Sequence, residues 1–217
     1  FGRVDVLINN AGILRDKSFP KMTNQDWDLI MTVHLKGAFN VQEHAGHTSE
    51  IKDSDESSIP ALDLVSTAHS VKPTTLLQSL VSMDSQDLAK EGEKRNIRVN
   101  TIAPIAGTRM TETVMAKEIV EAIKADYVVP LVAWLCHESC TETGSLFETG
   151  AGFITKQRFQ RTKGQCFDFD TFTPEAVRDK WSKVVDFTDA VIPESINDTL
   201  AEGMNNVGET KSSKARK

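Results

Sequence analysis

The chain has 217 residues, of which 39% are hydrophobic and 26% are charged, and its formal net charge is −6. This length can bury a substantial core, so we expect one globular domain, alone or followed by a tail. The acidic balance excludes a nucleic-acid-binding surface, because such a surface needs clustered Lys and Arg and the only basic run is the terminal KSSKARK.

No apolar stretch is long enough to cross a bilayer, and the first residues lack the features of a signal peptide. We therefore expect neither nucleic acid nor a membrane among the partners. Three cysteines are too few for a disulfide framework, which indicates a reducing compartment. The chain starts at Phe1 rather than Met, which suggests that it was cut from a longer one.

The first predicted elements are a strand and a helix. Residues 4–8 are rich in Val, Ile and Leu, which favours a strand covered on both faces and stopped by the Asn-Asn-Ala-Gly run at 9–12. Thr23 and Asn24 can cap a helix over 24–42. Its apolar stripe consists of Trp27, Ile30, Met31, His34, Leu35, Ala38 and Val41.

The middle of the chain is less regular. Residues 43–60 are acidic and serine-rich without a period, which predicts an exposed loop or disorder. A short strand is predicted over 62–65, and a helix over 73–80 beginning at Pro73.

Regular patterns return from Leu88. We predict a strand over 97–103 ending at Pro104, helices over 117–123 and 126–138, a broken final strand over 145–148 and 153–155, and a helix from Thr173-Pro174 to about Phe187. Beyond Pro193 no core pattern is present.

Strands that alternate with helices predict an α/β fold, in which right-handed crossovers build a doubly wound parallel sheet. Ligands of such sheets bind at the carboxyl ends of the strands. The segments 9–12 and 104–110 should therefore lie at one rim and form the wall of a cofactor site.

Five stretches carry a family resemblance: FGRVDVLINNAGILRD, DWDLIMTVHLKGAFNV, LAKEGEKRNIRVNTIAPIAGTRMTETVM, WLCHESC and TPEAVRDKW. Over residues 1–42 and 88–190 the chain resembles the short-chain dehydrogenase/reductase domain of the type 2 peroxisomal multifunctional enzymes, the D-bifunctional proteins. The resemblance implies a Rossmann-type sheet that is incomplete, because the chain begins near the fourth strand of the family and the first βαβαβ half is largely absent. It divides the chain into a partial domain over 1–190, with a non-family segment at 43–87, and a polar, flexible tail over 191–217.

The same resemblance implies a function and a compartment. Members of the family oxidise (3R)-3-hydroxyacyl-CoA with NAD in peroxisomal fatty-acid β-oxidation and form homodimers. Peroxisomal localisation rests on the resemblance alone, since the terminal Ala215-Arg216-Lys217 is not a peroxisomal signal of the S-K-L type.

The resemblance also assigns cofactor contacts. The adenosine side of the NAD site would be lined by Asn10, Ala11 and Gly12, where small residues let the backbone approach the cofactor. The nicotinamide end would be held by Ala106, Gly107, Thr108 and Arg109, with Thr108 hydrogen-bonding the carboxamide. An ordinary surface ion pair explains Arg109 equally well.

Three further features have competing interpretations. His34 takes the place where many short-chain dehydrogenases have an Asn that supports a proton relay, but a satisfied core histidine is the simpler description. Cys136 and Cys140 are assigned to packing and not to a metal, because two thiols and an adjacent His do not make a tetrahedral site. Gly150-Ala151-Gly152 lacks the third Gly and the long helix of a phosphate loop.

The catalytic groups of the family are missing. Its chemistry needs a Tyr with a Lys four residues later, because a nearby cation is required to lower the pKa of a phenol toward neutrality. The sole tyrosine is Tyr127, and Leu131 stands four residues on; a Gly-rich pyrophosphate turn is also absent from the sequence. The catalytic residues are therefore unknown.

The segment 43–87 has the length of the family's catalytic region but foreign content, which we interpret as a reading-frame slip or a faulty gene model. Substitutes within it would be Ser66, Thr67, His69 and Lys72, each of which is more simply an ordinary loop residue. The chain is expected to be inactive or, alternatively, to be a non-catalytic remnant that acts at most as a dimerisation module. We also expect aggregation, since an incomplete sheet exposes an edge and an apolar face.

Overall fold

The computed structural model describes residues 4–13, 15, 19–50, 60–64, 87–113, 115–193 and 200–208. The chain divides into two compact units, Phe1–Gln157 and Arg158–Lys217. The predicted helix over 73–80 and the candidate residues Ser66, Thr67, His69 and Lys72 lie outside the described residues.

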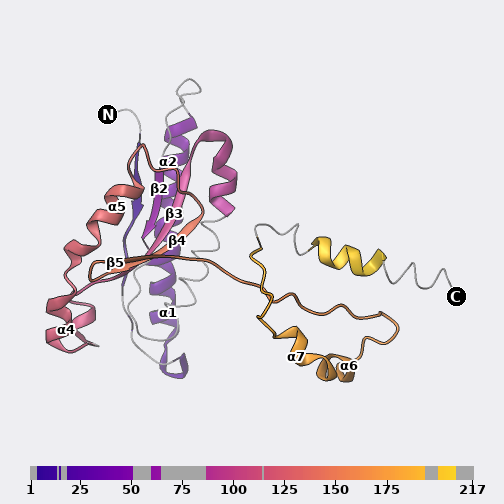
Figure 1. Ribbon diagram of the computed structural model, residues 1–217. Helices are drawn as coiled ribbons and strands as arrows, with labels where there is room; N and C mark the ends of the chain where they lie inside the picture. The colour runs from indigo at the N-terminus through magenta and orange to yellow at the C-terminus, as the bar shows by residue number, and fades with distance from the viewer. Residues whose placement is uncertain are drawn as a thin grey trace. The chain divides into compact units, whose positions relative to one another are not determined.

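The first unit is built on a five-stranded sheet whose spatial order follows the sequence (Figure 1). The first four strands are parallel to their neighbours, and the fifth is antiparallel to the fourth. This confirms the predicted parallel α/β sheet. The strands are β1 (Leu7–Asn9), β2 (Pro60–Leu64), β3 (Arg98–Ile105), β4 (Ser145–Gly150) and β5 (Phe153–Gln157).

Strand β3 has the longest run of buried residues among the strands whose burial the structure describes. Val99 to Ala103 are all buried, as expected for a parallel strand that is covered on both faces. The strand continues through Pro104 to Ile105, so it runs two residues past the predicted end at 103. Proline has no backbone N–H to donate to the hydrogen bonds between strands. Pro104 lies near the end of the pairing with β4, opposite Thr149.

The long helix after β1 begins where the sequence predicts. Thr23 caps it through a capping box: Thr23 Oγ1 accepts from the Asp26 backbone N at 3.1 Å, and Asp26 Oδ2 accepts from the Thr23 N at 3.4 Å. The helix consists of α1 (Asn24–Met31), a π-helical turn η2 (Thr32–Lys36) and α2 (Gly37–Glu50). It runs past the predicted end at Gln42, so the prediction of a loop was wrong for residues 43–50, while 51–59 lie outside the described residues.

The connection from β3 to β4 carries α4 (Lys117–Ala122), the single turn η5 (Ala125–Tyr127) and α5 (Val129–Leu135). The short turn η4 (Thr111–Thr113) precedes them, and η3 (Glu93–Arg95) precedes β3. Leu131 and Leu135 of α5 are buried, as expected for an amphipathic helix that packs on a sheet.

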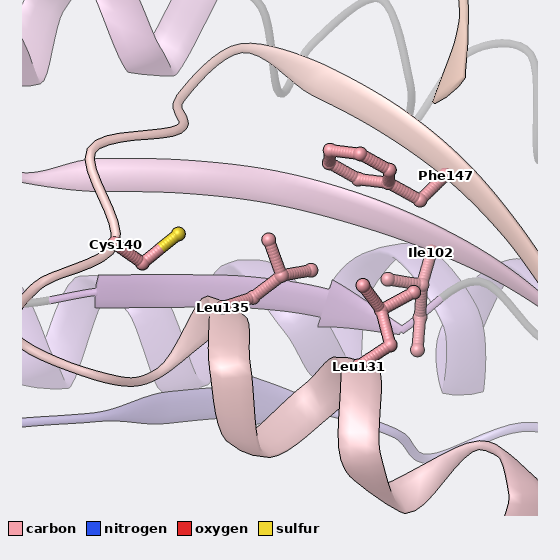
Figure 2. Close-up of a cluster of buried hydrophobic side chains, with 5 residues drawn as sticks. All are labelled: Ile102, Leu131, Leu135, Cys140 and Phe147. Carbon is pink, nitrogen blue, oxygen red and sulfur yellow. The ribbon is translucent and has the colours of Figure 1, made fainter. Parts of the chain in front are cut away.

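The core of the first unit lies under α5 (Figure 2). Figure 2 shows Leu131 and Leu135 of α5 directed toward Ile102 of β3 and Phe147 of β4, with Cys140 beside Leu135. Ile102 and Phe147 are register partners in neighbouring strands, so one layer of side chains joins the sheet to the helix. Removing this layer from water is the main force that holds α5 in place.

Helices cover both faces of the sheet, with α1 and α2 on one face and α5 on the other (Figures 1 and 2). The steps from β1 to β2 and from β3 to β4 cross the sheet in the same direction. Their helices lie on opposite faces, so the two crossovers have opposite hands. The expectation of uniformly right-handed crossovers was therefore wrong for one of them.

The segment predicted as a broken final strand forms a hairpin of two strands. Ala151 and Gly152 are its two loop residues, and both have positive φ, 50° and 80°. Two positive φ values define the turn whose twist fits a tight antiparallel hairpin. This explains why Gly150-Ala151-Gly152 is a turn and not a phosphate loop.

The second unit contains α6 (Pro174–Asp179), α7 (Trp181–Val184) and a helical stretch over 200–208 that the sequence did not predict. Thr173 caps α6 by accepting from the Ala176 N at 3.3 Å, and Pro174 occupies the first turn, both as predicted. The predicted single helix to Phe187 is interrupted at Lys180.

Candidate functional site

A cleft of about 550 Å³ lies between the sheet and α5, at the carboxyl ends of β1 and β3. Its position agrees with the rim at which parallel α/β sheets bind ligands. Its walls come from β1, from the loop after β3, and from η5 and α5. The lining residues are Val6, Ile8, Asn10, Pro104, Ala106, Thr108, Met110, Thr111, Ala125, Val128, Val129, Val132, Ala133 and Cys136.

The wall from β1 follows the alternation of a strand. Val6, Ile8 and Asn10 share one face and line the cleft, whereas the intervening Leu7 and Asn9 do not. Val6 and Ile8 remain 39% and 41% exposed. The strand therefore presents an apolar surface that ends in one amide side chain.

The loop after β3 is shaped by the hydroxyl of Thr111, a buried residue. Thr111 Oγ1 accepts from the Thr108 backbone N at 2.7 Å. Its distances to the backbone oxygens of Ala106 and Thr108 are 3.1 and 2.9 Å, so its proton can be donated to either of them. Thr108 Oγ1 accepts from the Met110 N at 3.3 Å and lies exposed at the rim, where it can donate its own proton to a ligand.

Gly107 fixes the same loop to α4. Its backbone N donates to the Ile123 O at 2.5 Å, and it forms a bridge with Lys124. A Cβ at this position would stand 1.9 Å from the Val120 O, so no other residue fits without a shift of the backbone. Glycine is therefore required here by close approach.

The loop after β1 is held by His34, which lies in the π-helical turn. His34 Nε2 is 3.0 Å from the Ile13 N and 2.9 Å from the Ile13 O. The imidazole also covers Gly12, where an added Cβ would meet His34 Cε1 at 3.0 Å. His34 is thus a satisfied, half-buried histidine, the simpler of the two interpretations, and it positions the segment that leads out of the cleft wall.

The wall from α5 ends at Cys136, the C-cap residue of the helix. Burial raises the pKa of the Cys136 thiol above its ordinary value of 9.0, and the neighbouring Cys140 raises it further. Both cysteines pack with the core cluster, which confirms the packing role predicted for them. Within the described residues no group of three or more His, Cys, Asp or Glu is placed to hold a metal ion.

The lining of the cleft suits the binding of a ligand better than the transfer of a proton. None of its lining residues carries a charge at neutral pH, and Cys136 is its one titratable side chain. Tyr127 lies just outside the lining and is 43% exposed, with the buried Leu131 one helical turn further on. An apolar volume with Asn10, Thr108 and Thr111 as hydrogen-bonding groups suits a flat ring system with polar substituents.

The structure brings together three of the seven predicted cofactor residues. Asn10, Ala106 and Thr108 line the cleft. Gly107 and Gly12 do not line it, and they instead allow the loops after β3 and β1 to pack closely against Val120 and His34. Ala11 and Arg109 are exposed and do not line it. The sequence analysis did not name Thr111, Val128 or Val132 as lining residues, and it assigned Cys136 to packing.

None of the helices in the described parts of the chain is both long and apolar enough to span a membrane.

A protein-family model described as enoyl-(acyl carrier protein) reductase matches residues 1–155. The chain belongs to the short-chain dehydrogenase/reductase family, whose members are NAD(P)-dependent oxidoreductases.

The similar proteins include peroxisomal multifunctional enzymes. The chain is 45% identical to mouse peroxisomal multifunctional enzyme type 2 over 92% of this chain and 28% of the relative. It is 43% identical to peroxisomal multifunctional enzyme A of Dictyostelium discoideum, over 93% of this chain and 45% of the relative. The solved structure of full-length peroxisomal multifunctional enzyme type 2 from Drosophila melanogaster superposes with a TM-score of 0.79 at 30% identity, covering 94% of this chain and 38% of that one. The chain thus spans less than half the length of these relatives.

Proposed function

We propose that this chain is part of the dehydrogenase unit of a peroxisomal multifunctional enzyme, a unit that oxidises (3R)-3-hydroxyacyl-CoA with NAD. The observation that carries the proposal is the cleft, which gathers Asn10, Ala106 and Thr108 from two strands at the rim where the family places its cofactor. The likeness to mouse and Dictyostelium peroxisomal enzymes supports the substrate class and the compartment. Homodimerisation belongs to the same proposal.

The lining fits part of a dinucleotide. A ring can lie on the Val and Ile side chains of β1 and α5, and Thr108 can hydrogen-bond an amide substituent. Across the described residues no Gly-rich turn leads from a strand directly into a helix, so a pyrophosphate site is not part of this fit. Asn10, Ala106 and Thr108 would hold the cofactor, which would supply the hydride acceptor when bound.

A second function, a non-catalytic interaction module, is favoured by the chemistry of the cleft. Proton transfer needs a group within hydrogen-bond reach whose pKa lies near the working pH. Cys136 has a raised pKa, and Tyr127 has no Lys four residues later. We propose that the chain retains the binding surface of the family without its turnover.

Two measurements on the purified 217-residue chain separate these functions. Titration with NADH, followed by nucleotide fluorescence, should show binding that the Thr108→Val substitution weakens, whereas Tyr127→Phe should bind like the parent. NADH formation from NAD and a (3R)-3-hydroxyacyl-CoA should be absent. Turnover that is abolished by Ser66→Ala or His69→Ala would overturn the inactive assignment, and no difference between Thr108→Val and the parent would overturn the cleft as the binding site.

A further inference from the structure

Two thiols lie at the end of α5, one on the cleft and one in the core. Cys136 lines the cleft and is partly exposed, whereas Cys140 is only 2% exposed. Figure 2 shows the sulfur of Cys140 directed toward the side chain of Leu135, within the core cluster. Cys136 packs against that same cluster, and the Cys140 thiol contributes to its raised pKa, so the two thiols lie within electrostatic reach of each other.

The backbone between them makes a compact turn. The Cys136 N donates to the Val132 O at 3.0 Å, which is the last bond of the helical ladder, and the Cys140 N donates to the His137 O at 2.9 Å. The chain thus folds back directly after the helix. Both cysteines are free thiols in the structure.

We propose that Cys136 and Cys140 form a redox pair, in which a hydroperoxide oxidises Cys136 and Cys140 closes an intramolecular disulfide that deforms the α5 wall of the cleft. The order of events follows from access. A small oxidant can reach Cys136 through the cleft, while the buried Cys140 can react only with a neighbour. The effect on nucleotide binding rests on the proposed function, but the formation of the disulfide does not.

The chemistry balances with the hydroperoxide as the oxidant. The Cys136 thiolate attacks one peroxide oxygen, the O–O bond breaks, and the leaving alkoxide takes a proton to become an alcohol. Cys140 then loses its proton and attacks the Cys136 sulfur, so that the S–S bond forms, the S–O bond breaks and water leaves. Two thiols lose two electrons, and one hydroperoxide gains them.

The reaction should be slow at neutral pH and faster in alkali. Only the thiolate is nucleophilic, and burial and the neighbouring Cys140 raise the pKa of Cys136, so little thiolate is present near pH 7. A raised thiol pKa therefore moves the rise of the rate to higher pH.

An aromatic contact reports on the turn. The Trp134 ring stacks on His137, with centroids 6.0 Å apart and an interplanar angle of 14°. His137 lies between the two cysteines in sequence, so a disulfide that tightens residues 136–140 moves one ring relative to the other. Tryptophan emission should change on oxidation, and the change should be lost in Trp134→Phe.

The test uses the full chain with Cys166→Ser, so that the exposed thiol does not compete. After treatment with hydrogen peroxide, non-reducing peptide mass mapping should show that the peptide with Cys136 and Cys140 has lost two hydrogens, and a thiol reductant should restore it. Cys140→Ala should stop at a sulfenic acid on Cys136 that a 1,3-diketone traps. A sulfenic acid on Cys140 in Cys136→Ala, or equally fast disulfide formation in denaturant, would overturn the proposal.

Nucleotide binding provides an independent readout. The oxidised chain should bind NADH about tenfold more weakly than the reduced chain, and reduction should restore the affinity. Equal affinities would refute the coupling to the cleft. If neither form binds NADH, the proposed function fails. The proposal of a redox pair is then tested by the disulfide mapping and the Trp134 emission alone.

Discussion

The imidazole of His34 binds both backbone atoms of Ile13, 21 residues earlier: Nε2 lies 3.0 Å from the nitrogen and 2.9 Å from the oxygen. One ring nitrogen cannot serve both at once. It accepts from the Ile13 N–H when it lacks a proton and donates to the Ile13 carbonyl when it carries one. The loop is therefore held in either tautomer, which explains how a π-helical turn can fix the exit of β1.

Replacing this histidine should loosen the loop without unfolding the sheet. His34→Ala removes a part-buried hydrogen bond, so we expect a loss of about 1 kcal/mol in the free energy of unfolding. Urea unfolding measures this loss, and hydrogen exchange at the Ile13 amide should speed up. His34→Gln is the control, because its amide can still donate or accept. Unchanged exchange at Ile13 in His34→Ala would contradict the role.

Thr111 should matter both to the cleft and to the stability of the fold. Thr111→Val keeps the shape but leaves the Thr108 N–H without its acceptor, which costs about 1–3 kcal/mol. Because this bond shapes the Ala106–Thr108 rim, NADH affinity should fall together with stability. Thr111→Ser retains the hydroxyl and should recover both. Equal affinities for the Val and Ser variants, measured by titration, would argue against this bond.

Gly107 should tolerate no side chain. In Gly107→Ala the new Cβ would meet the Val120 O at 1.9 Å, so the contact between the loop and α4 must open, with a loss of more than about 3 kcal/mol. Gly37→Ala is a matched control in the same unit, since its Cβ would meet only the Thr32 O at an ordinary 3.6 Å. Thermal unfolding of the two variants should differ widely, and similar melting temperatures would refute the close approach.

The Glu142–Lys156 pair should give a small stability change in acid. Glu142 Oε2 accepts from Lys156 Nζ at 2.7 Å and from Ser145 Oγ at 3.1 Å, and mainly the Lys156 bond lowers the pKa of Glu142 below its ordinary 4.5. A lowered folded pKa means that the stabilisation is complete above 4.5 and is lost as the pH falls through the folded value. The pair is largely exposed, so it contributes at most about 1 kcal/mol.

The measurement is the urea midpoint as a function of pH at low salt. The parent should lose more stability than Glu142→Gln on going below the ordinary carboxyl pKa, and Lys156→Met should resemble Glu142→Gln. High salt should reduce the difference, since it screens exposed charges. Parallel curves for parent and Glu142→Gln would show that the pair contributes nothing.

Self-association should occur through β1. Among the described strands β1 pairs only with β2 and is an edge strand, and Val6 and Ile8 carry exposed apolar side chains there. Sedimentation velocity should show species that grow with concentration. Val6→Lys should reduce them, while Ile119→Lys, an exposed position on α4, should not. A monomer at every concentration would contradict the prediction.

The sequence predicted the parallel sheet because predicted strands alternate along the chain with predicted helices, which is the pattern of parallel α/β sheets. It also placed Thr23 and Thr173 as caps, since both precede helical periods. It failed at the hairpin because alanine rarely has positive φ, so Ala151 gave no indication of a turn. The segment was therefore predicted as one interrupted strand and not as two antiparallel strands.

The site was harder to predict than the fold. The residues 9–12 and 104–110 were placed at one rim by topology, and Asn10 and Thr108 do share the cleft. Thr111 was missed because its role depends on hydrogen bonds that fold the loop back on itself, which no spacing encodes. Val128 and Val132 have the periodicity of core residues, and their exposure to a cleft follows only from how α5 packs.

The two-residue turn at Ala151 and Gly152 also orders events during folding. It joins β4 to β5 directly, so this pairing closes a very short loop and forms on the timescale of an isolated hairpin. Every other pairing in the described sheet joins strands separated by a long crossover and must first overcome a larger loss of chain entropy. The hairpin is thus the earliest template on which β3 can add.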